Sequence, residues 1–311
     1  MDFKFLQNLK FSIINFSLSP ENELNLPFFR GATIRGALGY AFKKNICIKK
    51  EIVCKECNLI QDCVYIKLFE PKIKNKNEKV EEIPRPYVIE FPNERKNLYK
   101  TGEKFQFNLI LFGEAIQYFP YFFLSFIELG KTGLGKYREK FYIESVFQKY
   151  PTEKNIFKIG NEFMEKIEEK NFEIECKDIK SIKIKFITPT KIKNEGRFIQ
   201  VPEFSVFIKA ILRRVSQILY FWCDYKEKNN FSEILEDAEK VKIGRCSLKW
   251  IDYKRYSTRQ KTTMKMGGIL GEIEYRGNIG KFYPLISAGS YIHIGKNTSF
   301  GLGKYLIFSP D

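Results

Sequence analysis

Alternating apolar and polar residues mark the strands that this chain is expected to form. The clearest run is 181–190, SIKIKFITPT, in which isoleucine and lysine alternate, as they do in a strand with one buried and one exposed face. Runs of a similar kind occur at 4–18, 104–113 and 268–277. The pattern therefore predicts several half-buried strands spread along the whole chain.

Helices are predicted between these strands. Residues 202–225 carry apolar side chains at helical spacing, and Pro202 is suited to the start of a helix. A glycine-punctuated, helix-like stretch at 31–44 follows the first predicted strand, and helix-length apolar segments follow 104–113 and 268–277. The polar run 151–173 predicts either a helix or a linker.

A short repeat divides the chain into two similar halves. The pentapeptide GLGKY occurs at 133–137 and again at 301–305, each time after a predicted strand and helix and before another strand. Each half also opens with a strand followed by a helix. We therefore predict an α+β protein of tandem ferredoxin-like (RRM-like, β-α-β-β-α-β) domains. The first would span 1–155 with a cysteine-rich insert at 46–70, and the second would span 156–311 with a glycine-rich loop. The alternative is one unrelated α+β domain with an accidental repeat.

The composition favours a folded protein with a polyanionic partner. The 311 residues are 44% hydrophobic and 16% aromatic, enough for a sizeable core. The formal net charge of +16 favours a polyanion or an anionic membrane surface. A spanning helix is not expected, because Glu114, Pro120 and Glu128 interrupt the most apolar stretch, 112–130. The charged N-terminus, 1–18, has no small-residue cleavage site, so we expect a cytoplasmic location.

Three segments carry a resemblance to a known family. They are FRGATIRGALGYAFKK at 29–44, the cysteine block that runs into CVYIKLFEP at 63–71, and the segment 267–305 with the second glycine loop. Together they resemble the RAMP superfamily of CRISPR-associated proteins, in particular the endoribonuclease that cuts precursor CRISPR RNA. The resemblance implies ferredoxin-like domains and binding of the repeat RNA and of the product guide RNA. It also implies metal-independent attack of a ribose 2′-hydroxyl on the adjacent phosphate, which leaves a 5′-hydroxyl and a cyclic phosphate.

Basic residues beside glycines and aromatic rings are the predicted RNA-binding groups. Glycines in the loop 295–304 let the backbone approach a phosphate closely. The segment 250–268 interleaves basic residues with Tyr253 and Tyr256, which suits RNA because cations follow the phosphates while rings stack on bases. The predicted RNA-binding residues are Arg30, Arg35, Lys131, Lys136, Arg213, Arg214, Arg255, Arg259, Lys261, Gly295, Lys296, Gly301, Gly303 and Lys304.

Two candidate catalytic sites remain open. Cleavage through the 2′-hydroxyl needs a proton acceptor, a cation near the phosphate and a proton donor for the departing 5′-oxygen. The resemblance implies a histidine on or near the first helix, but this chain has a single histidine, His293, beside the second glycine loop. The first helix offers Tyr40, Lys43 and Lys44 instead, which would act by positioning and electrostatics. His293 can equally be an RNA contact or a structural residue.

Four of the seven cysteines, Cys47, Cys54, Cys57 and Cys63, follow the pattern C-x6-C-x2-C-x5-C. Four thiolates at such a spacing can close a tetrahedral structural zinc site. An iron–sulfur cluster or no metal at all are the alternatives. Four thiolate ligands leave no open position for a substrate, so we do not expect this metal to be catalytic, and the resemblance implies that catalysis needs no cofactor.

Two other functions also fit the sequence. A non-catalytic RAMP subunit that holds guide RNA in an effector complex would need no acid or base, and the missing first-helix histidine favours it. A general RNA- or DNA-binding module would bind any phosphate chain with similar affinity. CRISPR repeat RNA is the expected partner, and the RAMP resemblance adds an RNA-guided effector complex as a candidate partner.

Overall fold

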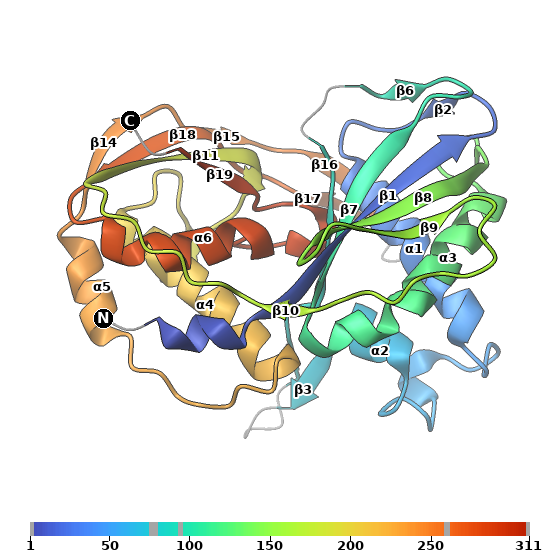
Figure 1. The fold of residues 1–311 in the computed structure, drawn as a ribbon, viewed down its shortest axis with the longest axis horizontal. Helices are drawn as coiled ribbons and strands as arrows, with labels where there is room; N and C mark the ends of the chain where they lie inside the picture. Colours follow the sequence, from blue (N-terminus) through green and yellow to red (C-terminus); the bar gives the residue numbers. More distant parts are fainter. Residues whose placement is uncertain (1–2, 75–79, 93–95, 258–261, 309–311) are drawn as a thin grey trace. The chain divides into compact units, whose positions relative to one another are not determined.

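Two units of the chain each contain one antiparallel sheet with helices packed on it (Figure 1). The computed structural model describes residues 3–74, 80–92, 96–257 and 262–308. The N-terminal unit is Phe11–Lys170, and the C-terminal unit combines Met1–Lys10 with Asn171–Asp311. The domain limits predicted from the sequence, 1–155 and 156–311, stay a prediction.

The sheet of the N-terminal unit has the strand order β5-β7-β1-β8-β9, with β10 paired to β1. The neighbouring strands from β5 to β9 in this order are all antiparallel, and the helices α1 and α3 pack against each other. Along the chain this gives β-α-β-β-α-β with the first strand in the interior of the sheet, as in a ferredoxin-like domain. The bounds are β1 (Lys10–Pro20), α1 (Arg30–Ile46), α2 (Val64–Phe69), β5 (Tyr87–Glu90), β7 (Phe105–Phe112), α3 (Phe119–Thr132), β8 (Phe141–Tyr150), β9 (Lys154–Lys158) and β10 (Lys170–Asn171).

The C-terminal unit repeats this arrangement. Its sheet has the order β14-β18-β11-β19, with β15 also paired to β18, and α4 packs against α6 and α5 (Figure 1). The order matches β5-β7-β1-β8 of the first unit, in which β9 is an additional edge strand, and GLGKY lies shortly before β8 in one unit and leads into β19 in the other. The bounds are β11 (Ser181–Thr190), α4 (Phe204–Trp222), α5 (Ser232–Glu239), β14 (Lys242–Cys246), β15 (Lys249–Ile251), β18 (Gly268–Arg276), α6 (Tyr283–Ile292) and β19 (Tyr305–Phe308).

Both units also contain short two-stranded ribbons and 3-10 turns. They are β2 (Leu24–Asn25) with β6 (Leu98–Tyr99), β3 (Lys72–Lys74) with β4 (Val80–Glu82), β12 (Lys193–Asn194) with β13 (Arg197–Phe198), and β16 (Lys254–Ser257) with β17 (Thr262–Lys265). The 3-10 turns are η1 (Lys4–Asn8), η2 (Cys54–Glu56), η3 (Gly113–Tyr118), η4 (Gly280–Phe282) and η5 (Thr298–Phe300).

The last α-helix of each unit, α3 in the first and α6 in the second, begins in the same way. A 3-10 turn precedes both α3 and α6, and each helix carries a proline in its first turn, Pro120 and Pro284, where the missing N–H removes no helical hydrogen bond. Aromatic rings fill the space between sheet and helix. The Phe16 ring, for example, lies 5.2 Å from Phe107 of the next strand and 4.7 Å from Phe126 of α3, which are favourable ring separations.

Two secondary-structure predictions were wrong in part. Residues 4–8 form a 3-10 turn rather than the start of a strand, because their backbone bonds locally: the N–H of Leu6 donates to the Phe3 carbonyl and the N–H of Leu9 to the Leu6 carbonyl, both at 2.9 Å. The run 151–173 contains β9 and β10 and no helix. Of the helices in the described part of the chain, none is long and apolar enough to span a bilayer.

Candidate functional site

The last two turns of α1 present the predicted first-helix group. Tyr40 is 72% exposed, and Lys43 and Lys44 follow three and four residues later, on the same side of the helix. The Lys44 Nζ atom lies 2.5 Å from Oε1 of Glu128 on α3. The structure thus brings together the three residues that the sequence proposed for this site.

Both lysines of this group are firmly cationic. The hydrogen bond to Glu128 raises the pKa of Lys44 above its usual value. A hydrogen bond with the sulfur of Cys54 raises the pKa of Lys43, against the opposing effect of partial burial. Both residues also lie in the last turn of α1, where the helix dipole favours positive charge. These side chains can stabilise a developing negative charge, but at neutral pH neither can accept a proton.

Arg30 and Arg35 of the same helix make contacts inside the N-terminal unit. Arg30 is buried, donates to the carbonyl of Lys96 and lies 5.5 Å from the Tyr99 ring centroid. Arg35 Nη2 donates to the Phe69 carbonyl at 3.2 Å. These contacts anchor α1 to the segments that flank it.

The first glycine loop is exposed and basic. Lys131 lies in the last turn of α3, and Lys136 lies in a tight turn closed by two backbone hydrogen bonds between Leu134 and Glu139. The Lys136 ammonium lies 5.2 Å from the ring centroid of Tyr137, which is itself exposed. The turn therefore offers a cation beside an accessible aromatic ring.

His293 is fully buried at the C-terminal end of α6. Its Nδ1 atom lies 3.0 Å from the carbonyl oxygen of Leu302. Since a carbonyl can only accept, Nδ1 carries the proton in this contact. The imidazole therefore connects the two ends of the second glycine loop.

The backbone of the second glycine loop is held by neighbouring segments. The N–H of Ile294 donates to the Gly303 carbonyl at 3.0 Å, and the N–H of Lys296 donates to the Lys191 carbonyl at 3.1 Å. The N–H of Lys304 donates to the Thr188 hydroxyl at 2.9 Å. These three N–H groups are used within the unit and are not available to a phosphate, but the loop also carries two lysine side chains. Of these, Lys296 is exposed and Lys304 is half-buried.

Two glycines of this loop are required by the close packing. Gly295 and Gly303 have φ values of +81° and +85°, which L-residues with side chains rarely adopt. A Cβ atom on Gly295 would lie 2.5 Å from the Lys191 carbonyl oxygen. The sequence predicted the glycines but not Thr188 or Lys191, because which hydroxyl or carbonyl lies opposite a loop N–H depends on how distant segments fold together.

The two arginines predicted on α4 have different environments. Arg213 is exposed. Arg214 points into the unit, and burial lowers its pKa to about 9. Arg255 lies on β16, and its side chain is outside the described part of the structure, as are the residues Arg259 and Lys261.

The four clustered cysteines lie between α1 and α2, where the chain forms only the short turn η2. All four are half-buried free thiols. Within the described ranges, no three His, Cys, Asp or Glu side chains come close enough together to hold a metal ion. In this conformation the cysteines therefore do not form a tetrahedral site, and structural zinc stays a prediction.

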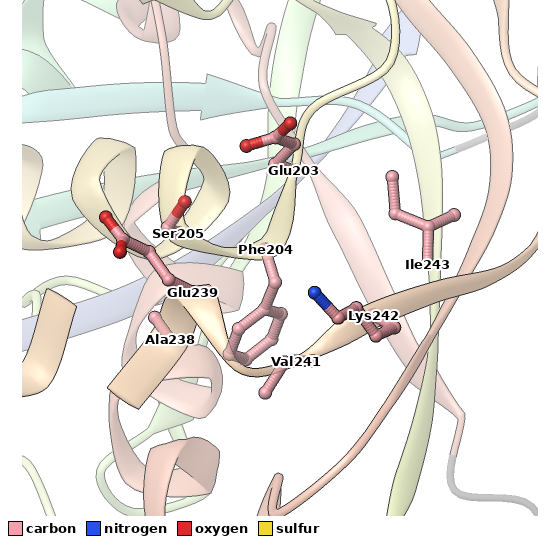
Figure 2. Close-up of a pocket in the computed structure, with 8 residues that line it drawn as sticks. All are labelled: Glu203, Phe204, Ser205, Ala238, Glu239, Val241, Lys242 and Ile243. Atoms are coloured by element: carbon pink, nitrogen blue, oxygen red, sulfur yellow. The ribbon is translucent and has the colours of Figure 1, made fainter. Parts of the chain in front are cut away.

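A cavity of about 300 Å³ opens in the C-terminal unit. Figure 2 shows it between the first turn of α4 and the segment Ala238–Ile243, with the side chains of Glu203, Glu239 and Lys242 around it. None of the residues predicted to bind or cleave a substrate lines this cavity.

Each half of the chain matches the model of a known protein domain. Residues 9–171 match the N-terminal domain model AF_1859_N, and residues 184–305 match the model of the CRISPR-associated endoribonuclease Cas6. The second match includes His293 and the second glycine loop. An uncharacterized protein of Archaeoglobus fulgidus is 24% identical over 294 residues, which is 92% of this chain and 94% of the relative.

Solved structures with the same fold come from Cas6 proteins. The Thermus thermophilus Cas6 TTHB231, in a product complex, has a TM-score of 0.56 and 15% identity, covering 96% of this chain and 99% of that chain. A partial Cas6-RT-Cas1–Cas2 complex has a TM-score of 0.58 and 13% identity, covering 97% of this chain and 46% of that chain. These similarities confirm the predicted tandem ferredoxin-like fold.

Proposed function

Because this chain belongs to the Cas6-type RAMP endoribonucleases that process CRISPR RNA, we propose that it cuts the precursor within each repeat by 2′-hydroxyl attack. The 2′-oxygen loses its proton and bonds to the adjacent phosphorus, while the bond from phosphorus to the 5′-oxygen breaks and that oxygen gains a proton. The products are a cyclic phosphate and a 5′-hydroxyl. No atom in this exchange has to come from a metal ion or another cofactor.

The proposal for the catalytic site rests on Tyr40, Lys43 and Lys44, of which Tyr40 and Lys44 are exposed and Lys43 is half-buried. A lysine cation beside the scissile phosphate stabilises the extra negative charge of the transition state. Both lysines keep that charge at neutral pH, as lysines ordinarily do, and Glu128 and Cys54 raise their pKa values further. The Tyr40 hydroxyl can donate a hydrogen bond to a phosphate or 5′-oxygen, since its side chain is exposed. A site without a proton acceptor near neutral pH is expected to be slow.

His293 is proposed as a positioning residue. Its imidazole is buried and bonded to the Leu302 carbonyl, so it holds the glycine loop rather than touching the reacting atoms. The loop would then present Lys296 and Lys304 to phosphates of the RNA. Arg213, Lys131 and Lys136 are the further RNA contacts that we propose.

The first experiment tests the reaction. Purified protein is incubated with its repeat RNA in excess chelator, and the ends of the products are mapped. We expect one cut per repeat, with a cyclic phosphate and a 5′-hydroxyl, and no cut when the nucleotide at that site carries a 2′-deoxy group. Cleavage of the deoxy substrate would refute the mechanism, and tight binding without any product would favour a non-catalytic subunit.

The second experiment tests the site by single-turnover cleavage. We expect Lys44→Ala and Lys43→Ala to slow cleavage by about ten-fold or more each, and Tyr40→Phe to slow it if the hydroxyl donates in the reaction. Lys158→Ala is the matched control, since Lys158 is an exposed lysine on the edge strand β9 of the same unit. Equal rates in Lys44→Ala, Lys43→Ala and Lys158→Ala would remove the first helix from the mechanism.

We also propose that the cut guide RNA stays bound and reaches an RNA-guided effector complex in that form. The chain has 53 basic and 37 acidic residues, and this excess of positive charge supports retention of a polyanionic product. Gel-shift titration of the cleaved product at fixed salt tests this. Release of the product at the same salt as arbitrary RNA of equal length would contradict it.

We propose that the four clustered cysteines bind a structural zinc ion. The spacing C-x6-C-x2-C-x5-C supports this proposal, because four thiolates at such a spacing can surround one ion. The 47–63 segment would have to rearrange to close around the ion. Metal analysis of the purified protein should find one zinc per chain, and Cys54→Ser/Cys57→Ser should lose it. Purified wild-type protein in which metal analysis finds no zinc would refute this proposal.

A further inference from the structure

An aromatic pair in the C-terminal unit has no role in the function proposed so far. Phe198 of β13 and Trp250 of β15 have ring centroids 6.3 Å apart, with planes inclined by 40°. Phe198 is 51% exposed and Trp250 is half-buried. The Lys191 ammonium lies 5.0 Å from the Phe198 ring centroid and 5.9 Å from that of Trp250, close enough for a cation–π interaction with each.

The surroundings of the pair are basic. Lys193 and Arg197 on the β12–β13 hairpin are exposed, and Lys249 next to Trp250 is exposed as well. The register of the hairpin sets Lys193 opposite Phe198. A large apolar ring left half in water and flanked by cations suits a ligand that has both flat rings and negative charge.

The pair is joined through the backbone to the second glycine loop. The carbonyl of Lys191 accepts the N–H of Lys296 at 3.1 Å, and the carbonyl of Ile192 accepts the N–H of Ile199 at 3.0 Å. The absence of a Cβ atom on Gly295 allows this approach. Lys191 thus belongs both to the aromatic pair and to the support of the loop whose lysines we assign to RNA phosphates.

We propose that the aromatic pair is a stacking subsite for one unpaired base of the bound RNA. This proposal rests on the RNA-processing function above and adds to it a contact with a base. The two rings are already within contact distance of each other, so the base would stack on the exposed side of Phe198 and not between the rings. An unpaired base is required, because only a base outside a continuous duplex leaves its face open. Lys191 and Lys296 would contact the flanking phosphates.

Binding of an uncleavable repeat RNA, with a 2′-deoxy group at the cut site, tests the subsite. We expect Phe198→Ala to weaken binding by about 5- to 150-fold, the range that corresponds to one base–aromatic stack. Phe198→Tyr should restore most of the affinity, because it keeps the ring. The matched control is Tyr220→Ala on α4, since Tyr220 is 48% exposed and has the Lys226 ammonium 4.5 Å from its ring.

Tryptophan fluorescence gives a second readout that does not depend on affinity. The chain has two tryptophans, and Trp222 is buried in α4 whereas Trp250 is accessible. We expect RNA binding to quench fluorescence in Trp222→Phe, where Trp250 is the reporter, and to leave Trp250→Phe unchanged. Thermal melting of every variant identifies any that fails to fold. If Phe198→Ala fails to fold, the quenching of Trp250 fluorescence in Trp222→Phe decides whether RNA binds at the aromatic pair.

The outcomes separate the two proposals. If the wild type cleaves repeat RNA but Phe198→Ala binds within two-fold of it and Trp250 is not quenched, the subsite is refuted and the function stands. If the wild type cuts no repeat RNA but Phe198→Ala loses binding, the function fails and the subsite stands. Affinities that depend on salt but on neither ring would show that phosphate contacts alone hold the RNA.

Discussion

Replacement of Gly303 by alanine should destabilise the C-terminal unit. Gly303 has a φ of +85°, and a Cβ atom there would overlap the carbonyl oxygen of Ile294 and lie 2.9 Å from the Ile294 nitrogen. Ile294 is also the residue whose N–H donates to the Gly303 carbonyl. The methyl group can therefore be accommodated only if this hydrogen bond or the backbone of the loop shifts.

A second glycine of the same unit isolates the steric part of the effect. Gly196 in the turn between β12 and β13 also has a φ of +85°, but its Cβ position has no atom within 4 Å. Gly196→Ala should therefore cost only the left-handed conformation, ~1–2 kcal/mol. Gly303→Ala adds a clash of ~1–3 kcal/mol, for a total of ~2–5 kcal/mol.

Urea unfolding with Trp222 fluorescence measures these losses, because Trp222 is buried in the same unit. For a unit of this size, 1 kcal/mol corresponds to a fall in Tm of about 2–4 °C, so thermal melting provides a second measure. Gly303→Ala should also bind repeat RNA more weakly than the wild type at equal salt. Equal losses of stability in the two variants would refute the close packing of the loop described here.

Further predictions concern charge. The rate of RNA cleavage should show no inflection between about pH 6 and 8, because Lys43 and Lys44 have raised pKa values and lose their charge only above the usual lysine range; an inflection near 6.5 that His293→Gln abolishes would instead make His293 the base. Arg213→Gln should reduce the slope of log affinity against log salt by ~0.7–0.9, and Arg214→Met should leave it unchanged, since only Arg213 is exposed. Burial lowers the pKa of Arg214 to about 9 in the folded protein, so the unfolded state binds the extra proton above pH 9, and the free energy of unfolding should rise with pH there; a rise that persists in Arg214→Met would contradict this assignment. Glu128→Gln should change stability by less than ~1 kcal/mol in thermal melts, because its pair with Lys44 is partly exposed.

Much of the fold follows from periodicity in the sequence. The alternation over 181–190 coincides with β11, and the helical spacing of 202–225 contains α4 within a few residues at each end. These elements were predictable because one face of each is buried, so the spacing of apolar residues reports their geometry. The run 151–173 gave no such signal, because β9 and β10 are short strands among polar residues.

The candidate site was less predictable, because charge does not reveal the direction of a side chain. Arg214 was predicted to bind RNA, yet it lies on the same helical face as the buried residues Ile211 and Ile218, three residues before and four residues after it. This helical spacing was visible in the sequence and would have predicted that Arg214 is buried. The approach of Lys191 to Phe198 and Trp250 was not visible, since it depends on how the β12–β13 hairpin and β15, a strand of another sheet, come together in the fold.

The N-terminal segment has a consequence for the order of folding during synthesis. Residues 3–10 belong to the C-terminal unit, where the Phe5 ring lies 5.5 Å from Phe231 and the Leu9 carbonyl accepts the N–H of Phe172. On the ribosome, the unit Phe11–Lys170 can be completed first, while the segment that precedes it waits for partners that have yet to be translated. A ribosome-bound chain stalled after residue 170 should therefore leave Phe5 and Leu9 accessible to chaperones, and release of the finished chain should bury them.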